Sequence, residues 1–488
     1  MLNLFSGKAD HPMADPKEAR RILEQLPAQE LKALDELAHW HESVSLADGF
    51  KPAERLQLLT GIDDAAQPRV RKVARDYFAA TRPSRYQENL MWTQLHEYWR
   101  QSGLAWARAI DALLQTGKGG DAKALPAAAV RALRSLGQQI KWQHLRYGPI
   151  DAAVWGVINR IYAAAESRGI AEARLEFLKI AMFSASSPDG LLPFELELAE
   201  RLIGDFAAGF ALAAAPAREL LYWTDLGRPM APARASKKPP AAAPGLRLFG
   251  PGAALATLEG LIQRIEATGQ LPSGVNLGGN YEPDAALEVM RHLAMYWASE
   301  PPERKHPRHS VKSRLAIAHG FEGVVEALGG AGASLDFNQR SAERWTVENV
   351  SAGGIGAIVP QIKGDWLRIG TLLAIQPDGG TNWVVGMVRR VNRVSKQEAR
   401  VGIQTLSRAP ALAKFALRGA GDQVGVLLPS PVLGSGDTSI ALRAGLYTRG
   451  QNLETEMHGR QHVYMAQNVA ERGDDYEVVR FRQMVREA

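Results

Sequence analysis

The fold of this chain is decided by residues 345–354, which read Trp-Thr-Val-Glu-Asn-Val-Ser-Ala-Gly-Gly. Trp345 and Val347 alternate with two polar residues, the period-two pattern that predicts a strand with one buried face. Ile, Gly, Ala, Ile and Val follow directly and continue the β-like composition. We therefore expect this part of the chain to form an antiparallel sheet that turns at the glycines.

The predicted turn carries groups that can bind a ligand. Asn349 offers an amide and a carbonyl, and Ser351 offers a rotatable hydroxyl. Gly353 and Gly354 lack a Cβ, so a ligand could approach the main chain closely there. The alternative is an ordinary strand-end turn with no ligand, because Asn, Ser and Gly are common turn residues.

Asn-x-Ser-x-x-Gly at a strand end resembles the second signature of PilZ domains, small β-barrels that bind the bacterial second messenger cyclic di-GMP. The first signature of that family is Arg-x-x-x-Arg, placed where the chain enters the barrel. Here Arg304-Lys-His-Pro-Arg308 stands just before the expected first strand. The resemblance covers roughly residues 300–408, and the Asn-x-Ser-x-x-Gly pattern occurs only at Asn349.

The resemblance implies a set of ligand-binding residues. Arg304 and Arg308 would grip phosphate and guanine edges, because a guanidinium donates two parallel hydrogen bonds to either group. The other side of the ligand would meet Asn349, Ser351, Gly353 and Gly354.

The gap between the two signatures departs from the family pattern, since it is longer than usual. The excess lies in the Gly-rich segment 329–344, which ends in a second Arg-x-x-x-Arg pair, Arg340 and Arg344. This pair is a rival for the ligand role. We prefer Arg304 and Arg308 because they precede the first strand.

Composition sets the broad class. The 488 residues are 46% hydrophobic and 23% charged, which is typical of a multidomain globular protein. The formal net charge of +6 is mildly basic and favours a phosphate-bearing partner without requiring one. Cysteine is absent, which excludes disulfides and thiolate metal sites and indicates the cytoplasm. No segment is long and apolar enough to be expected to insert in a membrane.

The pattern predicts a multidomain α+β fold. Helical periodicity dominates an α-helical domain at 1–225, in which Trp92, Trp99 and Trp106 form a stripe interpreted as core. The remaining divisions expected are a Pro/Ala-rich basic linker at 226–250, a helical connector at 251–300, a PilZ-like six-stranded antiparallel β-barrel at 301–410, and an accessory β-domain or barrel extension at 411–488.

The function expected is a cytoplasmic cyclic di-GMP receptor of a bacterium that passes the signal to a protein partner through its helical domain. No cofactor, metal site or catalytic residue is expected, because the sequence has no phosphate-cradling, metalloprotease or serine-hydrolase motif. The alternative is a PilZ-like interaction module that does not bind nucleotide. Nucleic-acid binding is disfavoured because the aromatic residues follow helical core patterns and do not alternate with basic ones.

Overall fold

The computed structural model describes residues 9–485 apart from 80–83, 117–120, 236–240, 242, 273–276, 278–280, 301–306, 331–342, 396, 418–420, 430–436, 449 and 458–459. The chain forms two compact units. The first comprises residues 1–146, 150–188 and 193–302, and the second comprises 147–149, 189–192 and 303–488. No helix of the described residues has the length and apolar composition needed to cross a membrane.

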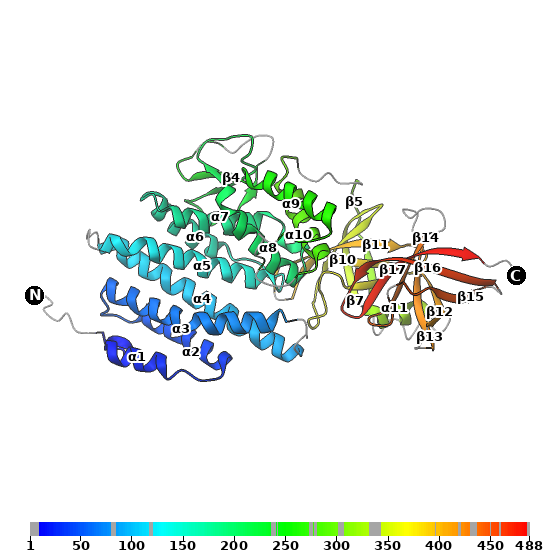
Figure 1. Ribbon diagram of the computed structural model, residues 1–488, viewed down its shortest axis with the longest axis horizontal. Helices are drawn as coiled ribbons and strands as arrows, with labels where there is room; N and C mark the ends of the chain where they lie inside the picture. The colour runs from blue at the N-terminus through cyan, green and yellow to red at the C-terminus, as the bar shows by residue number, and fades with distance from the viewer. Residues whose placement is uncertain are drawn as a thin grey trace, which may run out of the picture. The chain divides into compact units, whose positions relative to one another are not determined.

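The first unit, called here the helical unit, is built from helices that pack side by side (Figure 1). They are α1 (Pro16–Glu24), α2 (Glu30–Leu46), α3 (Pro52–Tyr77), α4 (Arg85–Thr116), α5 (Leu125–His144), α6 (Ala152–Glu166), α7 (Ala171–Ala185), α8 (Pro193–Phe206), α9 (Ala254–Thr268) and α10 (Pro283–Trp297). Trp99 and Trp106 of α4 are buried, which confirms that these indoles belong to the core. Trp92 is half-buried, and its indole N–H donates to the carbonyl of Trp142.

A buried carboxylate ties three helices of this unit together. Asp63 of α3 accepts hydrogen bonds from Tyr98 Oη at 2.9 Å and Trp106 Nε1 at 2.8 Å, both on α4. The Nε2 atom of His41 on α2 lies 3.0 Å from Oδ1. Burial alone would raise the pKa of Asp63, but these partners outweigh it and hold the pKa below its usual value.

The prediction of a linker at 226–250 is wrong for the residues of this range that the structure describes. β1 (Ala211–Ala213), β2 (Tyr222–Asp225), β3 (Ala233–Arg234) and β4 (Leu246–Gly250) form a sheet in the order β1-β4-β2-β3. Leu246 and Leu248 are buried, and Asn159 of α6 donates to the carbonyl of Arg228. The prolines fit this segment because irregular and edge backbone tolerates a missing N–H.

The helical connector expected at 251–300 is also not a separate part. α10 belongs to the helical unit, where the buried Trp297 donates from Nε1 to Ser186 Oγ at 3.0 Å and meets Phe210 edge-on. The two units divide at Pro302 and Glu303.

The second unit contains two barrels. The first barrel includes β5 (His309–Ser310), β6 (Arg314–His319), β7 (Glu343–Ser351), β8 (Gly354–Val359), β9 (Leu372–Pro377), β10 (Val384–Arg393) and β11 (Ala399–Ser407). Its strand order is β5-β7-β6-β9-β10-β11-β8. A further pairing between β7 and β8 closes the six strands from β6 to β11 into a barrel. The short β5 pairs with the same edge of β7 as β6 does. Trp345 and Val347 face the core, as the alternation predicts.

One predicted strand of this barrel is wrong. Composition and a glycine turn at 320 predict that residues 323–328 form a strand paired with residues 314–319, but in the structure they lie in helix α11 (Gly320–Gly329). β8, which follows the Asn349 turn directly, takes the sixth place in the barrel. Gly320 has φ +76°, a value that favours glycine and lets the chain leave β6 for α11.

Residues after 410 form a second barrel rather than an extension of the first. β12 (Ala411–Leu417), β13 (Gly421–Leu428), β14 (Asp437–Arg443), β15 (Leu453–Met457), β16 (Arg460–Arg472) and β17 (Tyr476–Val485) close in the order β12-β13-β14-β17-β16-β15. Phe321 and Val324 of α11 share one apolar cluster with residues of both barrels. The helix therefore joins the two barrels within the second unit.

Candidate functional site

The two signatures meet across a strand pair. His309 on β5 pairs with Val350 on β7, and Ser310 pairs with Asn349. Because the strands are antiparallel, Arg308 precedes β5 at the end of β7 where Ser351 lies. The Arg308 side chain is exposed and makes no hydrogen bond or ion pair with the residues that the structure describes. Its guanidinium is therefore available at the edge of the Asn349 turn.

The turn itself is a tight hairpin between β7 and β8. Ser351 pairs with Gly354, and Ser351 Oγ donates to the Gly354 carbonyl at 3.2 Å. The backbone N–H of Thr405 on β11 donates to the Gly353 carbonyl at 3.1 Å. A Cβ on Gly354 would lie 2.2 Å from the carbonyl oxygen of Ile403. The packing of the barrel itself therefore requires glycine at 354, whether or not a ligand binds.

Asn349 stands at the end of a row that crosses the outer surface of the barrel. Asn349 pairs with Gly356 on β8, Gly356 pairs with Gly402 on β11, and Gly402 pairs with Arg390 on β10. We call these four residues the Asn349 row. A Cβ on Gly356 would lie 2.8 Å from both Nδ2 and Oδ1 of Asn349, so the amide lies over this glycine. The two glycines leave a flat, half-buried patch of backbone without side chains of its own, and the Asn349 amide covers the part of it at Gly356.

The Asn349 amide is half-buried and has its hydrogen-bonding capacity free. Its side chain makes no hydrogen bond with any residue in the described ranges. An amide can donate two hydrogen bonds and accept two, so this side chain can read a ligand that offers both kinds of group.

Sequence reasoning missed three arginines here: Arg390, which belongs to the row, and Arg400 and Arg408, which contact β7 or the turn after it. Arg408 Nη2 donates to the Ala352 carbonyl of the turn at 3.0 Å. Arg400 Nε lies 3.3 Å from a Glu348 carboxylate oxygen, and Arg390 Nε lies 3.2 Å from Asp189 within the second unit. They lie on or just after β10 and β11, far along the chain from the motifs, so only the strand register could have revealed them.

The remaining candidates fall into two groups. Arg304 and Arg340 lie outside the described residues. Arg344 lies on β7 opposite Ala316, five residues from Asn349, which corresponds to about 16 Å along a strand. Of the two described arginines, Arg308 is the one that the strand pairing brings to the motif.

The described residues contain no group of three or more His, Asp or Glu side chains that could hold a metal ion.

The comparisons with known proteins concern a different part of the chain. Residues 17–217 match the family model described as "Cyclic-di-GMP receptor FimW, N-terminal domain". The match begins in α1, ends after β1 and covers less than half of the 488 residues, so it lies in the helical unit. No curated protein matches the chain. The helical region is thus similar to part of a cyclic di-GMP receptor family.

Proposed function

We propose that this chain is a bacterial cyclic di-GMP receptor whose first barrel holds the dinucleotide. The observation that carries the proposal is the pairing of β5 with β7, which puts Arg308 beside Asn349 and Ser351. The family match supports the same ligand independently, because it rests on residues outside the barrel.

The geometry suits a flat, doubly charged ligand. A guanine ring needs a surface without protruding side chains, and Gly356 and Gly402 supply one on adjacent strands. Arg308 can donate two parallel hydrogen bonds to a phosphate or to the O6 and N7 atoms of guanine. The Asn349 amide can both donate to and accept from a guanine edge.

The surrounding charges support an anionic ligand. Arg390 belongs to the row, and Arg400 and Arg408 contact β7 or the turn after it, so three guanidiniums lie in or beside the row. Their combined positive potential would attract the two phosphates and speed association. Arg304 would complete the grip from the segment before Arg308, as the family resemblance implies.

The receptor would act without catalysis, in the cytoplasm where this messenger is made, and would signal through its helical unit to a protein partner. A ligand shifts such an equilibrium only if it binds one arrangement of the protein more tightly than another. Ligand binding at the Asn349 row would therefore change the affinity for the partner.

Titration calorimetry of the full chain tests the proposal. Cyclic di-GMP should release heat and saturate, whereas cyclic di-AMP and GTP at equal concentrations should give affinities at least about tenfold weaker, since guanine edges and a ring closed by two phosphodiesters are both recognised. No binding of cyclic di-GMP would favour the interaction module without a nucleotide.

A further inference from the structure

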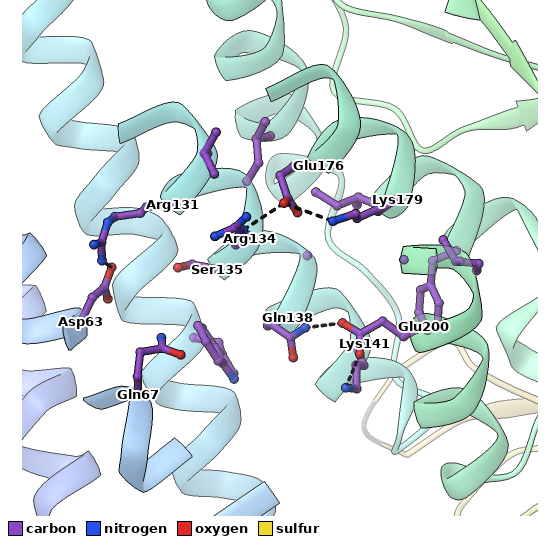
Figure 2. Close-up of a pocket in the computed structure, with 18 of the residues that line it drawn as sticks. Asp63, Gln67, Arg131, Arg134, Ser135, Gln138, Lys141, Glu176, Lys179 and Glu200 are labelled. Carbon is purple, nitrogen blue, oxygen red and sulfur yellow. Dashed lines mark hydrogen bonds and ion pairs between the residues drawn. The ribbon is translucent and has the colours of Figure 1, made fainter. Parts of the chain in front are cut away.

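The helical unit contains an open groove along one face of α5, with a cavity volume of about 860 Å³. Figure 2 shows α5 residues Arg131, Arg134, Gln138 and Lys141 between Asp63 and Gln67 on one side and Glu176, Lys179 and Glu200 on the other. We call this the α5 groove. Its α5 lining runs from Ala127 to Lys141, which is about 21 Å at the rise of an α-helix.

The α5 groove is long enough for another helix to lie along it. Ala127, Val130 and Gly204 line it with short side chains or none, which allows another backbone to approach closely. A Cβ placed on Gly204 of α8 would have no heavy atom within 4 Å, so the space over this residue is open. Four turns of helix would fill the length, as in complexes where an amphipathic helix lies in a groove.

Charge indicates the kind of helix. The groove lining includes six basic and four acidic side chains: Arg71, Arg131, Arg134, Lys141, Lys179 and Arg201 against Asp63, Asp64, Glu176 and Glu200. Arg134 and Lys179 share one oxygen of Glu176, at 2.9 Å and 3.2 Å. Arg71 is exposed and has no partner among the described residues. The exposed rim therefore attracts acidic groups.

The paired cations of the groove argue against a small anion as the occupant. Lys141 lies 2.5 Å from Glu197 and 2.6 Å from Glu200, and Arg131 contacts both Asp63 and Asp64. The buried Lys141 and the half-buried Arg131 are each paired with two carboxylates, whereas Arg71 and Arg134 are exposed at the rim. A long ligand that touches the rim and covers the apolar floor fits better than a compact one.

We infer that the α5 groove is the docking site for an acidic amphipathic helix of a protein partner. The inference deepens the proposed function, since it assigns the surface through which the receptor would contact its partner. Only the interpretation of this docking as signal output rests on the proposed function. Partner acidic residues would face Arg71 and Arg134, and the apolar side would lie on Val130, Ile180 and Gly204.

The experiment places a photocrosslinking amino acid at Gln67 of the full chain in its native cells, with mass spectrometry to locate the adduct. We expect one partner protein, linked through a helix that carries acidic residues on one face. In the purified pair, the double variant Arg71→Glu/Arg134→Glu should weaken binding at least about tenfold, because two attractions become repulsions. Lysines placed at the acidic positions of the partner helix should restore it.

Two matched pairs of variants control for folding. Gly204→Tyr should block the groove, whereas Gly204→Ala should bind the partner normally. Tyrosine and alanine both favour a helix at least as well as glycine, so neither change should unfold α8. Arg264→Glu changes an exposed arginine on α9, away from the groove, and should leave binding within about twofold. Thermal unfolding of each variant checks that the helical unit is intact.

Several outcomes would overturn the inference: an adduct within the chain or between two copies, an adduct to a basic or non-helical segment, or equal binding by Gly204→Tyr and wild type. Titration of the Arg71→Glu/Arg134→Glu variant with cyclic di-GMP tests the docking site separately from the proposed receptor function. Unchanged nucleotide affinity with lost docking supports the assignment. If the chain docks the partner helix but binds no cyclic di-GMP, the assignment of the groove is supported and the proposed receptor function is wrong.

Discussion

Ser310 lies opposite Asn349 in the β5–β7 pair, and this register places Arg308 at the Asn349 turn. The two signatures are separated by about forty residues of chain, yet the strand pair makes them neighbours. The same register would not bring Arg344 to the turn, because Arg344 pairs with β6 farther along β7.

Arg308→Ala should weaken cyclic di-GMP binding by about 10- to 100-fold, because a bidentate contact to guanine or phosphate contributes about 1–3 kcal/mol. Asn349→Ala should cause a loss of similar size. Arg480→Ala removes an exposed arginine on the second barrel and serves as the control. Calorimetry that gives Arg308→Ala the wild-type affinity would remove Arg308 from the site.

Salt dependence distinguishes a dinucleotide from a nucleic acid as ligand. Between about 50 and 200 mM salt, a protein with many phosphate contacts loses about 10³–10⁵ in affinity. Cyclic di-GMP carries two phosphate charges, so its affinity should fall less than about tenfold over this range. A steep loss, together with tight binding of a single-stranded oligonucleotide, would instead indicate nucleic-acid recognition.

Sequence patterns predicted the elements whose signals are local. The alternation around Trp345 predicted β7 with its buried face, and the tryptophan spacing predicted the buried face of α4. The segment after Gly320 was wrong because Phe321, Val324 and Ala327 also have helical spacing, and their burial between two barrels decides in favour of a helix.

Sequence patterns could not predict the surroundings of the turn. Gly356, Gly402 and Arg390 lie beside Asn349 only through the register of four strands, which depends on the bulges in β7 and β10. The strands at 233–234 and 246–250 were missed because prolines dominate that stretch and the pairing partners lie elsewhere in the helical unit.

Asp63→Ala should destabilise the helical unit by about 3–5 kcal/mol, since it leaves buried donors without their shared acceptor. In the wild type the folded protein lowers the pKa of Asp63, and this gives the sign of the pH effect. The ionised Asp63 stabilises the folded state above the unfolded pKa, and this stabilisation is lost as pH falls through the lower folded pKa. Wild type should therefore lose stability below about pH 4, and the variant should lose less.

Tryptophan fluorescence during urea unfolding measures this loss, because Trp106 donates to Asp63. Asp64→Ala is the control: the neighbouring side chain is 62% exposed and pairs with Arg131, so its loss should cost less than about 1 kcal/mol. Equal destabilisation by the two variants would contradict the role assigned to the buried carboxylate.

Tyr476→Phe should destabilise the second unit by about 1–2 kcal/mol. Tyr476 Oη of the second barrel donates at 2.5 Å to the Gly370 carbonyl, which precedes β9 of the first barrel. The variant leaves that carbonyl without its donor. Tyr447→Phe removes a hydroxyl that accepts from Gly450 N in an exposed turn, and urea unfolding should show a smaller effect. Equal effects would mean that the contact between the barrels contributes little.

Gly356→Ala tests whether the flat patch of the Asn349 row holds the ligand. The added methyl group would lie 2.8 Å from the Asn349 amide, so that side chain must move from its position over the strand. Cyclic di-GMP affinity should fall at least about tenfold, because both the amide and the bare backbone surface are lost.

Gly402→Ala should have a smaller effect, since its Cβ would lie 3.3 Å from Cβ of Arg390 and leaves the amide in place. Gly260→Ala on α9, where no atom lies within 4 Å of the new Cβ, should bind as wild type. A Gly356→Ala protein that unfolds normally and keeps its affinity would place the ligand elsewhere on the barrel.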